Sequence, residues 1–256
     1  MKFVYGSSER IFVNTSIGCK ASCKYCYLPK MQKENSIVCI SGEEAVSQVN
    51  RLYEFERGEN GTIISIGCYS ECLDEINKDK TRTILEQILP LGNYVQLATK
   101  QYVGQDLIDL IREKRCFEQQ ISIYISMPTI SRISEIEEGT INFEERINNI
   151  KRCIENNIKV VLYIKPFLGQ LTLKDINIYS DIIKEYKLPV VIGPYLTTDN
   201  LEVLSDVGEK VLYERKMGDE YEVFIEEIRK ITSVAIHSTE LIKQYRKERG
   251  KNGKFN

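Results

Sequence analysis

The sequence predicts an α/β fold, in which six strand–helix repeats form a parallel sheet that curves into a partly open barrel. Between Ile11 and Ile192, short β-branched runs alternate with amphipathic segments of helical length, which is the pattern of repeated βα units. The chain has 256 residues, of which 42% are hydrophobic and 28% charged. This composition is enough to fill the core of such a domain and excludes a disordered or fibrous chain.

The predicted strands are short and rich in Ile, Val or Tyr, as expected for strands buried on both faces of a parallel sheet. In chain order they are Ile11–Asn14, Thr62–Ile66, Tyr94–Ala98, Ile121–Ser126, Lys159–Lys165 and Pro189–Ile192. The segments between them are long enough for the helices that connect parallel strands.

The predicted helices fill these gaps. The first follows Ser41-Gly-Glu-Glu, which is a capping-box signature, and its apolar residues are spaced by three and four: Ala45, Val46, Val49, Leu52 and Tyr53. Further amphipathic stripes predict helices over Lys80–Leu89, Gln105–Glu113, Phe143–Asn156 and Leu173–Tyr186. Proline ends helical continuation, so Leu188-Pro189 closes the last of these helices.

The predicted barrel spans residues 1–195, and residues 196–256 form an extension packed on it within a single domain. Helices are expected around 219–230 and 239–248. No low-complexity linker separates the two parts, which is why one domain is predicted rather than two.

Charge and hydropathy exclude several classes of partner. The sequence has 35 Lys+Arg against 37 Asp+Glu, a net charge of −2, so no overall positive field favours nucleic acid as a partner. Apolar stretches such as Val160–Ile164 are strand-sized, whereas a membrane-spanning helix needs about 20 residues. The first residues turn polar too soon for a secretory signal, so we expect a cytoplasmic protein.

A cluster of cysteines follows the first predicted strand. In a reducing compartment, cysteines are more often metal ligands or free thiols than disulfides. Cys19, Cys23 and Cys26 have C-x3-C-x2-C spacing, and three thiolates in one loop bind a metal centre while leaving one coordination position open. A structural zinc site needs a fourth ligand, but no other cysteine lies nearby and the only histidine is the distant His237.

This loop resembles that of the radical S-adenosylmethionine (radical SAM) superfamily, and within it the spore photoproduct lyase-like group. The resemblance covers roughly residues 10–195. It implies a partial (β/α)6 barrel in which Cys19, Cys23 and Cys26 hold a [4Fe-4S] cluster whose fourth iron binds S-adenosylmethionine. It also implies an external one-electron reductant such as a flavodoxin or ferredoxin.

Further motifs match the positions at which the group contacts S-adenosylmethionine. Ser70 and Glu71, after the second strand, correspond to acceptors for the amino group of its methionine part. Lys100 matches a lysine that approaches the carboxylate, and Ser126 matches a contact to the ribose or carboxylate. For Glu71 the alternative is an ordinary solvated loop acid, and for Lys100, taken without the resemblance, a solvated strand-end lysine is the commoner meaning.

Glu137-Glu-Gly-Thr, followed by Arg146, is similar to the group's Glu-Pro-Gly-Thr and its downstream arginine, with Glu138 in place of the proline. The resemblance implies that Glu137 and Arg146 brace the loop and the cofactor. The alternative is an ordinary surface ion pair.

Cys68 occupies the position of a cysteine that returns a hydrogen atom in spore photoproduct lyases, and Tyr25 and Tyr27 match the tyrosines of those enzymes. The resemblance therefore implies catalytic roles for Cys68, Tyr25 and Tyr27. The alternative for Cys68 is packing as a small buried hydrophobe.

The activity implied is that of a radical SAM lyase, which generates a 5′-deoxyadenosyl radical and cleaves a bond in a small nucleobase-like substrate. Group membership and chain size favour a queuine lyase, converting queuine to 7-aminomethyl-7-deazaguanine, with acidic side chains expected at the guanine-like edge. One alternative is repair or modification of DNA or RNA, as in spore photoproduct lyases. Another is a non-catalytic electron carrier, although such proteins usually ligate every iron.

Overall fold

The computed structural model describes residues 2–31, 36–197, 203–206, 213–215 and 217–252. Its centre is an eight-stranded sheet in the order β1-β2-β6-β7-β8-β10-β11-β15. The strand bounds are β1 Val4–Gly6, β2 Arg10–Val13, β6 Ile63–Ile66, β7 Val95–Thr99, β8 Ile121–Ser126, β10 Lys159–Ile164, β11 Val190–Ile192 and β15 Val234–Ala235. All neighbouring pairs are parallel except β1 and β2, which confirms the predicted α/β partial barrel.

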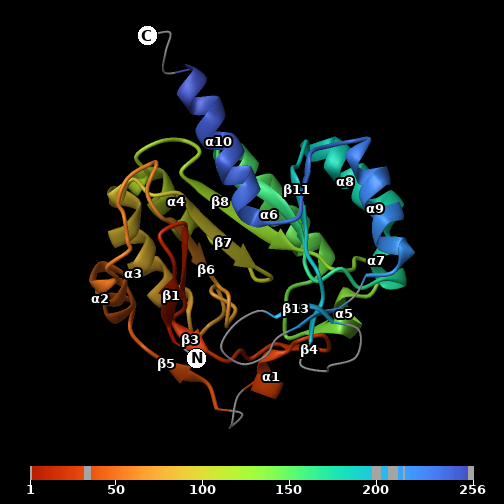
Figure 1. Cartoon of the computed structure of the whole chain (residues 1–256), viewed down its shortest axis with the longest axis horizontal. Helices are drawn as coiled ribbons and strands as arrows, with labels where there is room; N and C mark the ends of the chain where they lie inside the picture. Colours follow the sequence, from red (N-terminus) through yellow and green to blue (C-terminus); the bar gives the residue numbers. More distant parts are fainter. Residues whose placement is uncertain (1, 32–35, 198–202, 207–212, 216, 253–256) are drawn as a thin grey trace.

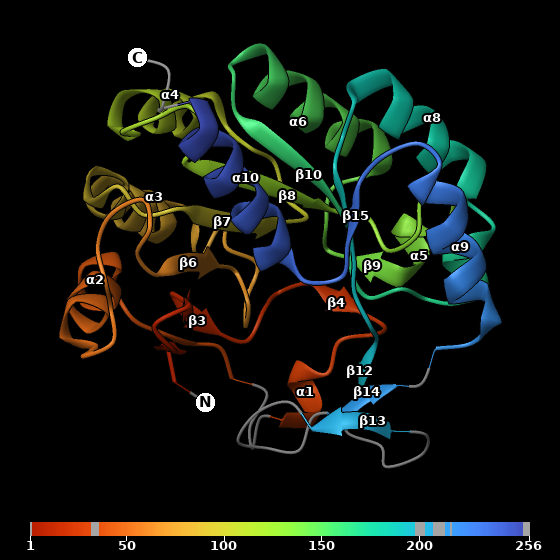
Figure 2. The ribbon, with the colours of Figure 1, turned by 45° about the horizontal axis from the view of Figure 1, so that its top comes forward.

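The helices that follow the strands cover the outer side of the curved sheet, and Figure 2 shows them as an arc around the strands. Their apolar faces pack with Ile64, Leu97 and Ile123 in one continuous core. This arrangement is expected because an amphipathic helix is stabilised by burying its apolar face. They are α2 Gly42–Arg51, α3 Lys78–Ile88, α4 Gln105–Lys114, α6 Phe143–Glu155, α8 Ile176–Tyr186 and α9 Asp219–Arg229. The 3-10 turn η1 (Leu89–Leu91) follows α3.

A last helix, α10 (Ser238–Asn252), lies against the inner side of the sheet, which it crosses in Figures 1 and 2. Leu241, Ile242 and Tyr245 pack with inward-facing strand residues in a second, smaller core. The amide of Gln96 also donates to the carbonyl of Ser238 at 2.8 Å. The helix therefore fills the inside of the barrel toward the amino ends of the strands.

Short elements gather at the carboxyl ends of the strands. They are β3 Ser16–Ile17, β4 Ser22–Cys23, α1 Leu28–Met31, β5 Val38–Cys39, α5 Ile133–Ile136, β9 Glu137–Glu138 and α7 Gln170–Leu173. Another small sheet consists of β12 Leu196–Thr197, β14 Tyr213–Arg215 and β13 Val203–Asp206. Within the part of the chain that the structure describes, no helix is long and apolar enough to cross a membrane.

The structure differs from the sequence-based expectation at element ends. Helix α2 stops at Arg51, and Tyr53, expected on its apolar stripe, is fully exposed. Helix α8 begins later than predicted, after the separate turn α7. Just before α8, the carboxylate of Asp175 accepts hydrogen bonds from the N–H groups of Ile130 (2.6 Å) and Ser131 (3.1 Å), which fixes the chain there.

Candidate active site

A cavity of about 400 Å³ opens at the carboxyl ends of the parallel strands, where barrel folds carry their reactive groups. All of the predicted site residues except Glu137 and Arg146 line it: Cys19, Cys23, Tyr25, Cys26, Tyr27, Cys68, Ser70, Glu71, Lys100 and Ser126. Residues that are far apart in the sequence thus meet in one cavity.

The cysteine loop is fixed by backbone pairing. Strand β4 pairs with β9 in antiparallel fashion, with Cys23 opposite Glu137, and the N–H of Cys26 donates to the carbonyl of Cys23 at 2.9 Å. The N–H of Gly18 donates to the carbonyl of Tyr69 at 3.1 Å. These bonds turn the loop so that all three thiols lie on the cavity wall.

Glu137 and Arg146 lie behind that wall. They form an ion pair at 2.6 Å, with both side chains 0% exposed, so the alternative of a surface ion pair is wrong. The hydroxyl of Tyr25 donates to the second carboxylate oxygen of Glu137, and Arg146 donates to the carbonyl of Ser126 and to the hydroxyl of Thr140. The pair connects α6 to the cysteine loop and does not itself reach the cavity.

The carboxylate of Glu71 is buried and almost fully bonded. It accepts from the hydroxyl of Thr99 (2.5 Å), the N–H of Leu73 (3.2 Å) and the N–H of Lys100 (2.8 Å). Since a carboxylate offers about four acceptor positions, one is left for a donor in the cavity. Burial raises the pKa of Glu71, and Lys100 opposes that rise. Glu71 is only 6% exposed, which excludes the solvated alternative.

Lys100 lies among negative groups, with its ammonium 5.9 Å from the centre of the Tyr25 ring. Burial alone would lower its pKa, but Glu137, Cys23 and Glu71 together raise it above the usual value. The lysine is therefore charged, and it can pair with an anionic group that enters the cavity.

Two hydroxyls on the cavity wall lack partners. Among the described residues, Ser70 Oγ and Ser126 Oγ are buried and make no hydrogen bond. A buried hydroxyl without a partner costs about 1–3 kcal/mol, which a ligand could recover. The two hydroxyls, the free position on Glu71 and the ammonium of Lys100 fit the amino, carboxylate and ribose groups of S-adenosylmethionine.

The three thiols fit a cluster better than a single ion. Burial raises the pKa of Cys23 to about 11, although Lys100 lowers it, so a positive metal centre is needed to hold the thiolate at neutral pH. In the part of the chain that the structure describes, no three Cys, His, Asp or Glu side chains converge on one ion position. In an iron–sulfur cluster each cysteine ligates a different iron, so the sulfurs stay apart.

Cys68 lies deeper in the cavity. It follows Gly67, whose φ is +91° and where a Cβ would lie 2.8 Å from the carbonyl oxygen of Ala98, so that the turn requires glycine. The N–H groups of Cys68 and Tyr69 both donate to the side-chain oxygen of Asn14, at 3.1 and 2.7 Å. Burial raises the pKa of the Cys68 thiol, which therefore keeps its hydrogen at neutral pH.

The tyrosines predicted around Cys68 have different surroundings. Burial is the largest cause of the raised pKa of Tyr27, and the nearby Cys68 is the second. The side chains of Tyr27 and Cys68 therefore lie close together. Tyr25 is instead bonded to Glu137. A residue that sequence reasoning missed, Tyr5, donates its hydroxyl to Cys68 Sγ at 3.3 Å. It lies on β1, a three-residue edge strand too short to give a periodic signal.

The deep end of the cavity carries basic and aromatic side chains. Arg10, Lys165 and His237 line it, none of which sequence analysis assigned to the site. Glu71, at the cofactor end, is the acidic residue among the described lining residues. The acidic side chains expected at a guanine-like edge are therefore not found in the described lining.

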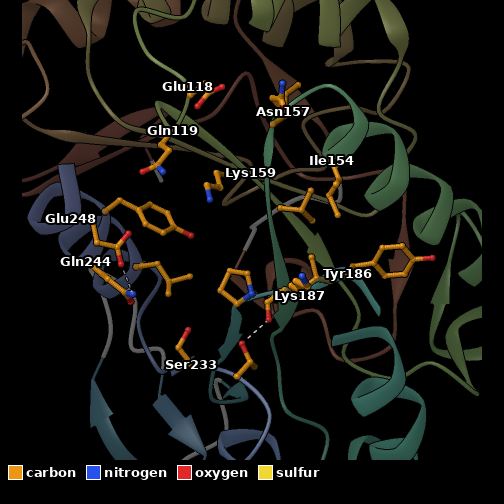
Figure 3. Close-up of a pocket in the computed structure, with 17 residues that line it drawn as sticks. Glu118, Gln119, Ile154, Asn157, Lys159, Tyr186, Lys187, Ser233, Gln244 and Glu248 are labelled. Carbon is orange, nitrogen blue, oxygen red and sulfur yellow. Dashed lines mark hydrogen bonds between the residues drawn. The ribbon is translucent and has the colours of Figure 1, made fainter. Parts of the chain in front are cut away.

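A second cavity, of about 440 Å³, lies at the opposite ends of the strands (Figure 3). Lys159 begins β10, and Ser233 directly precedes β15; Gln244 and Glu248 come from α10. It contains no cysteine and none of the predicted site residues. Its position at the amino ends separates it from the cluster of functional side chains.

Comparisons with known proteins find one family model that matches this chain. The family model described as "Radical SAM superfamily" matches residues 13–182. No curated protein matches the chain.

Several solved structures share the fold. SuiB of Streptococcus suis bound to S-adenosylmethionine has a TM-score of 0.62 at 14% identity, covering 90% of this chain and 50% of SuiB. Spore photoproduct lyase complexed with dinucleoside spore photoproduct has a TM-score of 0.62 at 13% identity, covering 86% of this chain and 74% of that enzyme. The chain thus spans about half the length of SuiB.

Proposed function

The chain belongs to the radical SAM superfamily, and from that premise we propose that it is a radical lyase acting on a small nucleobase-like molecule, with queuine as the substrate. Its cofactors are a [4Fe-4S] cluster and S-adenosylmethionine. When bound, these supply a carbon radical that removes a hydrogen atom from the substrate. The superfamily also requires an external one-electron reductant.

One observation carries this proposal: a single cavity joins the three thiols, two unpartnered hydroxyls and the half-buried thiol of Cys68. Cys19, Cys23 and Cys26 would hold the cluster. Ser70, Glu71, Lys100 and Ser126 would orient S-adenosylmethionine between the cluster and the deep end. The walls of the cavity would limit access of other reactants to the reacting groups, which suppresses side reactions.

The aromatic wall of the deep end supports a flat substrate. The ring centres of Phe12 and Tyr5 are 5.0 Å apart, and those of Tyr5 and Tyr69 are 5.2 Å apart, both pairs stacked. Arg10 lies 4.5 Å over the Phe12 ring and keeps guanidinium donors for a carbonyl oxygen. Such a surface suits a planar heterocycle that carries an oxo group.

In the proposed reaction, a substrate carbon that carries a hydroxyl loses a hydrogen atom, the C–N bond of the neighbouring carbon breaks, and the hydroxyl proton leaves with the amine as a carbonyl forms. The carbon radical that is left takes a hydrogen atom from Cys68. The sulfur radical of Cys68 is then reduced by one electron from the external reductant and one proton from water. Tyr27, next to Cys68, would shield this transfer, whereas Tyr25 would act through Glu137 on the loop.

The product assay tests this proposal. The reconstituted protein would be reduced anaerobically with dithionite in the presence of S-adenosylmethionine and queuine, and small molecules analysed by mass spectrometry. We expect 7-aminomethyl-7-deazaguanine together with 5′-deoxyadenosine. Formation of 5′-deoxyadenosine without the deazaguanine product would contradict queuine as the substrate.

The alternative is action on DNA or RNA, which the pairing of Cys68 with a nearby tyrosine favours by analogy with spore photoproduct lyase. Three of the basic residues in the last helix contact the protein itself. Lys243 pairs with Glu9 at 2.6 Å, Arg249 pairs with Glu59 at 2.7 Å, and Arg246 donates to the carbonyl of Glu59 at 2.9 Å. Tight, salt-sensitive binding of an oligonucleotide would support this alternative over queuine.

A further inference from the structure

We propose that Tyr5 is a positioning residue for Cys68: its hydroxyl donates to Cys68 Sγ and thereby directs the thiol hydrogen into the cavity. The inference rests on the hydrogen-donor role proposed above for Cys68. It adds a residue outside residues 13–182, the part of the chain that matches the family model.

The geometry holds both groups in place. The Tyr5 hydroxyl lies 3.3 Å from Cys68 Sγ, and the Tyr5 ring is stacked between the rings of Phe12 and Tyr69. Asn14 fixes the backbone at Cys68 through the N–H bond of 3.1 Å. Neither partner can turn away without losing packing or a buried hydrogen bond.

The chemistry decides where the thiol hydrogen points. A phenol O–H is a stronger donor than a thiol S–H, and sulfur is a weak acceptor, so the phenol donates and the sulfur accepts. The S–H bond of Cys68 then points away from Tyr5. Cys68 and Tyr5 both line the cavity, and of the directions left to the S–H bond we assign the one that faces the substrate.

Both groups keep their hydrogens at neutral pH. Burial, followed by the neighbouring Cys68, raises the pKa of Tyr5. Burial also raises the pKa of Cys68, and the hydrogen bond from Tyr5 opposes that rise. The phenol therefore donates to a neutral thiol and does not convert it to a thiolate.

The test is Tyr5→Phe, which removes the hydroxyl and leaves the aromatic stack. With queuine as the probe, products are measured relative to the 5′-deoxyadenosine formed in the same reaction, so that any change in cofactor cleavage is divided out. The cleaved carbon fragment, whose radical takes its hydrogen atom from Cys68, should fall about three- to ten-fold relative to 5′-deoxyadenosine, the loss expected for one neutral hydrogen bond. Tyr53→Phe, at a fully exposed tyrosine, is the matched control and should leave this ratio unchanged. An unchanged ratio in Tyr5→Phe would overturn the proposal.

A double-mutant cycle separates positioning from packing. If Tyr5 acts through Cys68, Tyr5→Phe should have no further effect on this ratio in a Cys68→Ala background. Equal losses in both backgrounds would mean that Tyr5 acts on the substrate or the fold.

A readout without substrate or turnover keeps this inference distinct from the queuine proposal. We would measure alkylation of Cys68 by iodoacetamide against pH in the cluster-loaded protein, mapping the modified peptide by mass spectrometry. Since the Tyr5 hydroxyl lowers the Cys68 pKa, Tyr5→Phe should shift the alkylation profile to higher pH. A profile identical to wild type would refute the hydrogen bond even if queuine proved to be the substrate, and a shifted profile would support it even if queuine were not.

Discussion

Glu137 and Arg146 form a fully buried ion pair, with 2.6 Å between carboxylate oxygen and guanidinium nitrogen, directly behind the cysteine loop. Glu137 also lies opposite Cys23 in the β4–β9 pair and accepts from the hydroxyl of Tyr25. The position of the loop is thus set by a charge pair that solvent does not screen.

The first prediction concerns this pair. Arg146→Met leaves the carboxylate of Glu137 buried without its partner, so the free energy of unfolding should fall by about 3–5 kcal/mol. Urea denaturation of the protein measures it. The matched control is Arg132→Met, which breaks the half-exposed pair with Glu135 and should cost less than about 1 kcal/mol. Equal losses in the two variants would contradict the bracing role.

A second prediction concerns the cysteine loop. Cys23→Ala should abolish loading of the [4Fe-4S] cluster, because two thiolates cannot replace three. Iron content and the visible absorption of the reconstituted protein measure the loading. Cys39→Ala, at an exposed cysteine outside the cavity, is the control and should load iron as the wild type does. Full loading of Cys23→Ala would remove this residue from the ligand set.

The third prediction is a pH dependence set by Glu71. In the proposed complex its ionised form accepts the ammonium of S-adenosylmethionine, and burial raises its pKa. Affinity for the cofactor should therefore rise with pH as Glu71 loses its proton and fall as pH drops below that pKa. Calorimetric titration of the cluster-loaded protein measures the affinity across pH.

In Glu71→Gln the affinity should be at least about ten-fold weaker, as expected for a lost charged hydrogen bond, and this pH dependence should disappear. Glu75→Gln changes an exposed carboxylate and should preserve both. A pH dependence retained in Glu71→Gln would assign it to another group.

The fourth prediction separates ligand binding from stability at two buried serines. Ser126→Ala removes an unpartnered hydroxyl from the cavity wall, so the protein without cofactor should be equally or more stable. Affinity for S-adenosylmethionine should nevertheless fall about two- to ten-fold, the value of one hydrogen bond. Ser122→Ala removes another unpartnered hydroxyl that does not line the cavity and should not change affinity. Equal affinities for wild type and Ser126→Ala would exclude this contact.

The six parallel core strands could be predicted from the sequence because each has a local pattern of β-branched residues, and the packing of the folded protein favours the same structure. Strands β1 and β15 were missed, since edge strands of two or three residues are too short to show an alternating pattern of apolar residues. Tyr53 was misassigned because its spacing continues the apolar stripe of α2, while the chain itself leaves the helix at Leu52.

The candidate site was predictable where its residues form local motifs. The C-x3-C-x2-C spacing singled out the three cysteines, and the family resemblance built on that loop implied Glu71, Lys100 and Ser126 at strand ends. Tyr5 and Lys165 contribute single side chains from distant segments, and only the folded sheet brings them to Cys68. The burial of the Glu137–Arg146 pair could not be predicted either, because the spacing of two residues in the sequence does not specify how far their side chains lie from solvent.

The most direct test of radical chemistry in this cavity is 5′-deoxyadenosine release by the reconstituted, dithionite-reduced protein in the presence of S-adenosylmethionine. We predict release in proportion to loaded cluster in the wild type, and none with Cys23→Ala. A protein that loads the cluster fully but releases no 5′-deoxyadenosine, with or without queuine, would contradict the assignment of this cavity to radical chemistry.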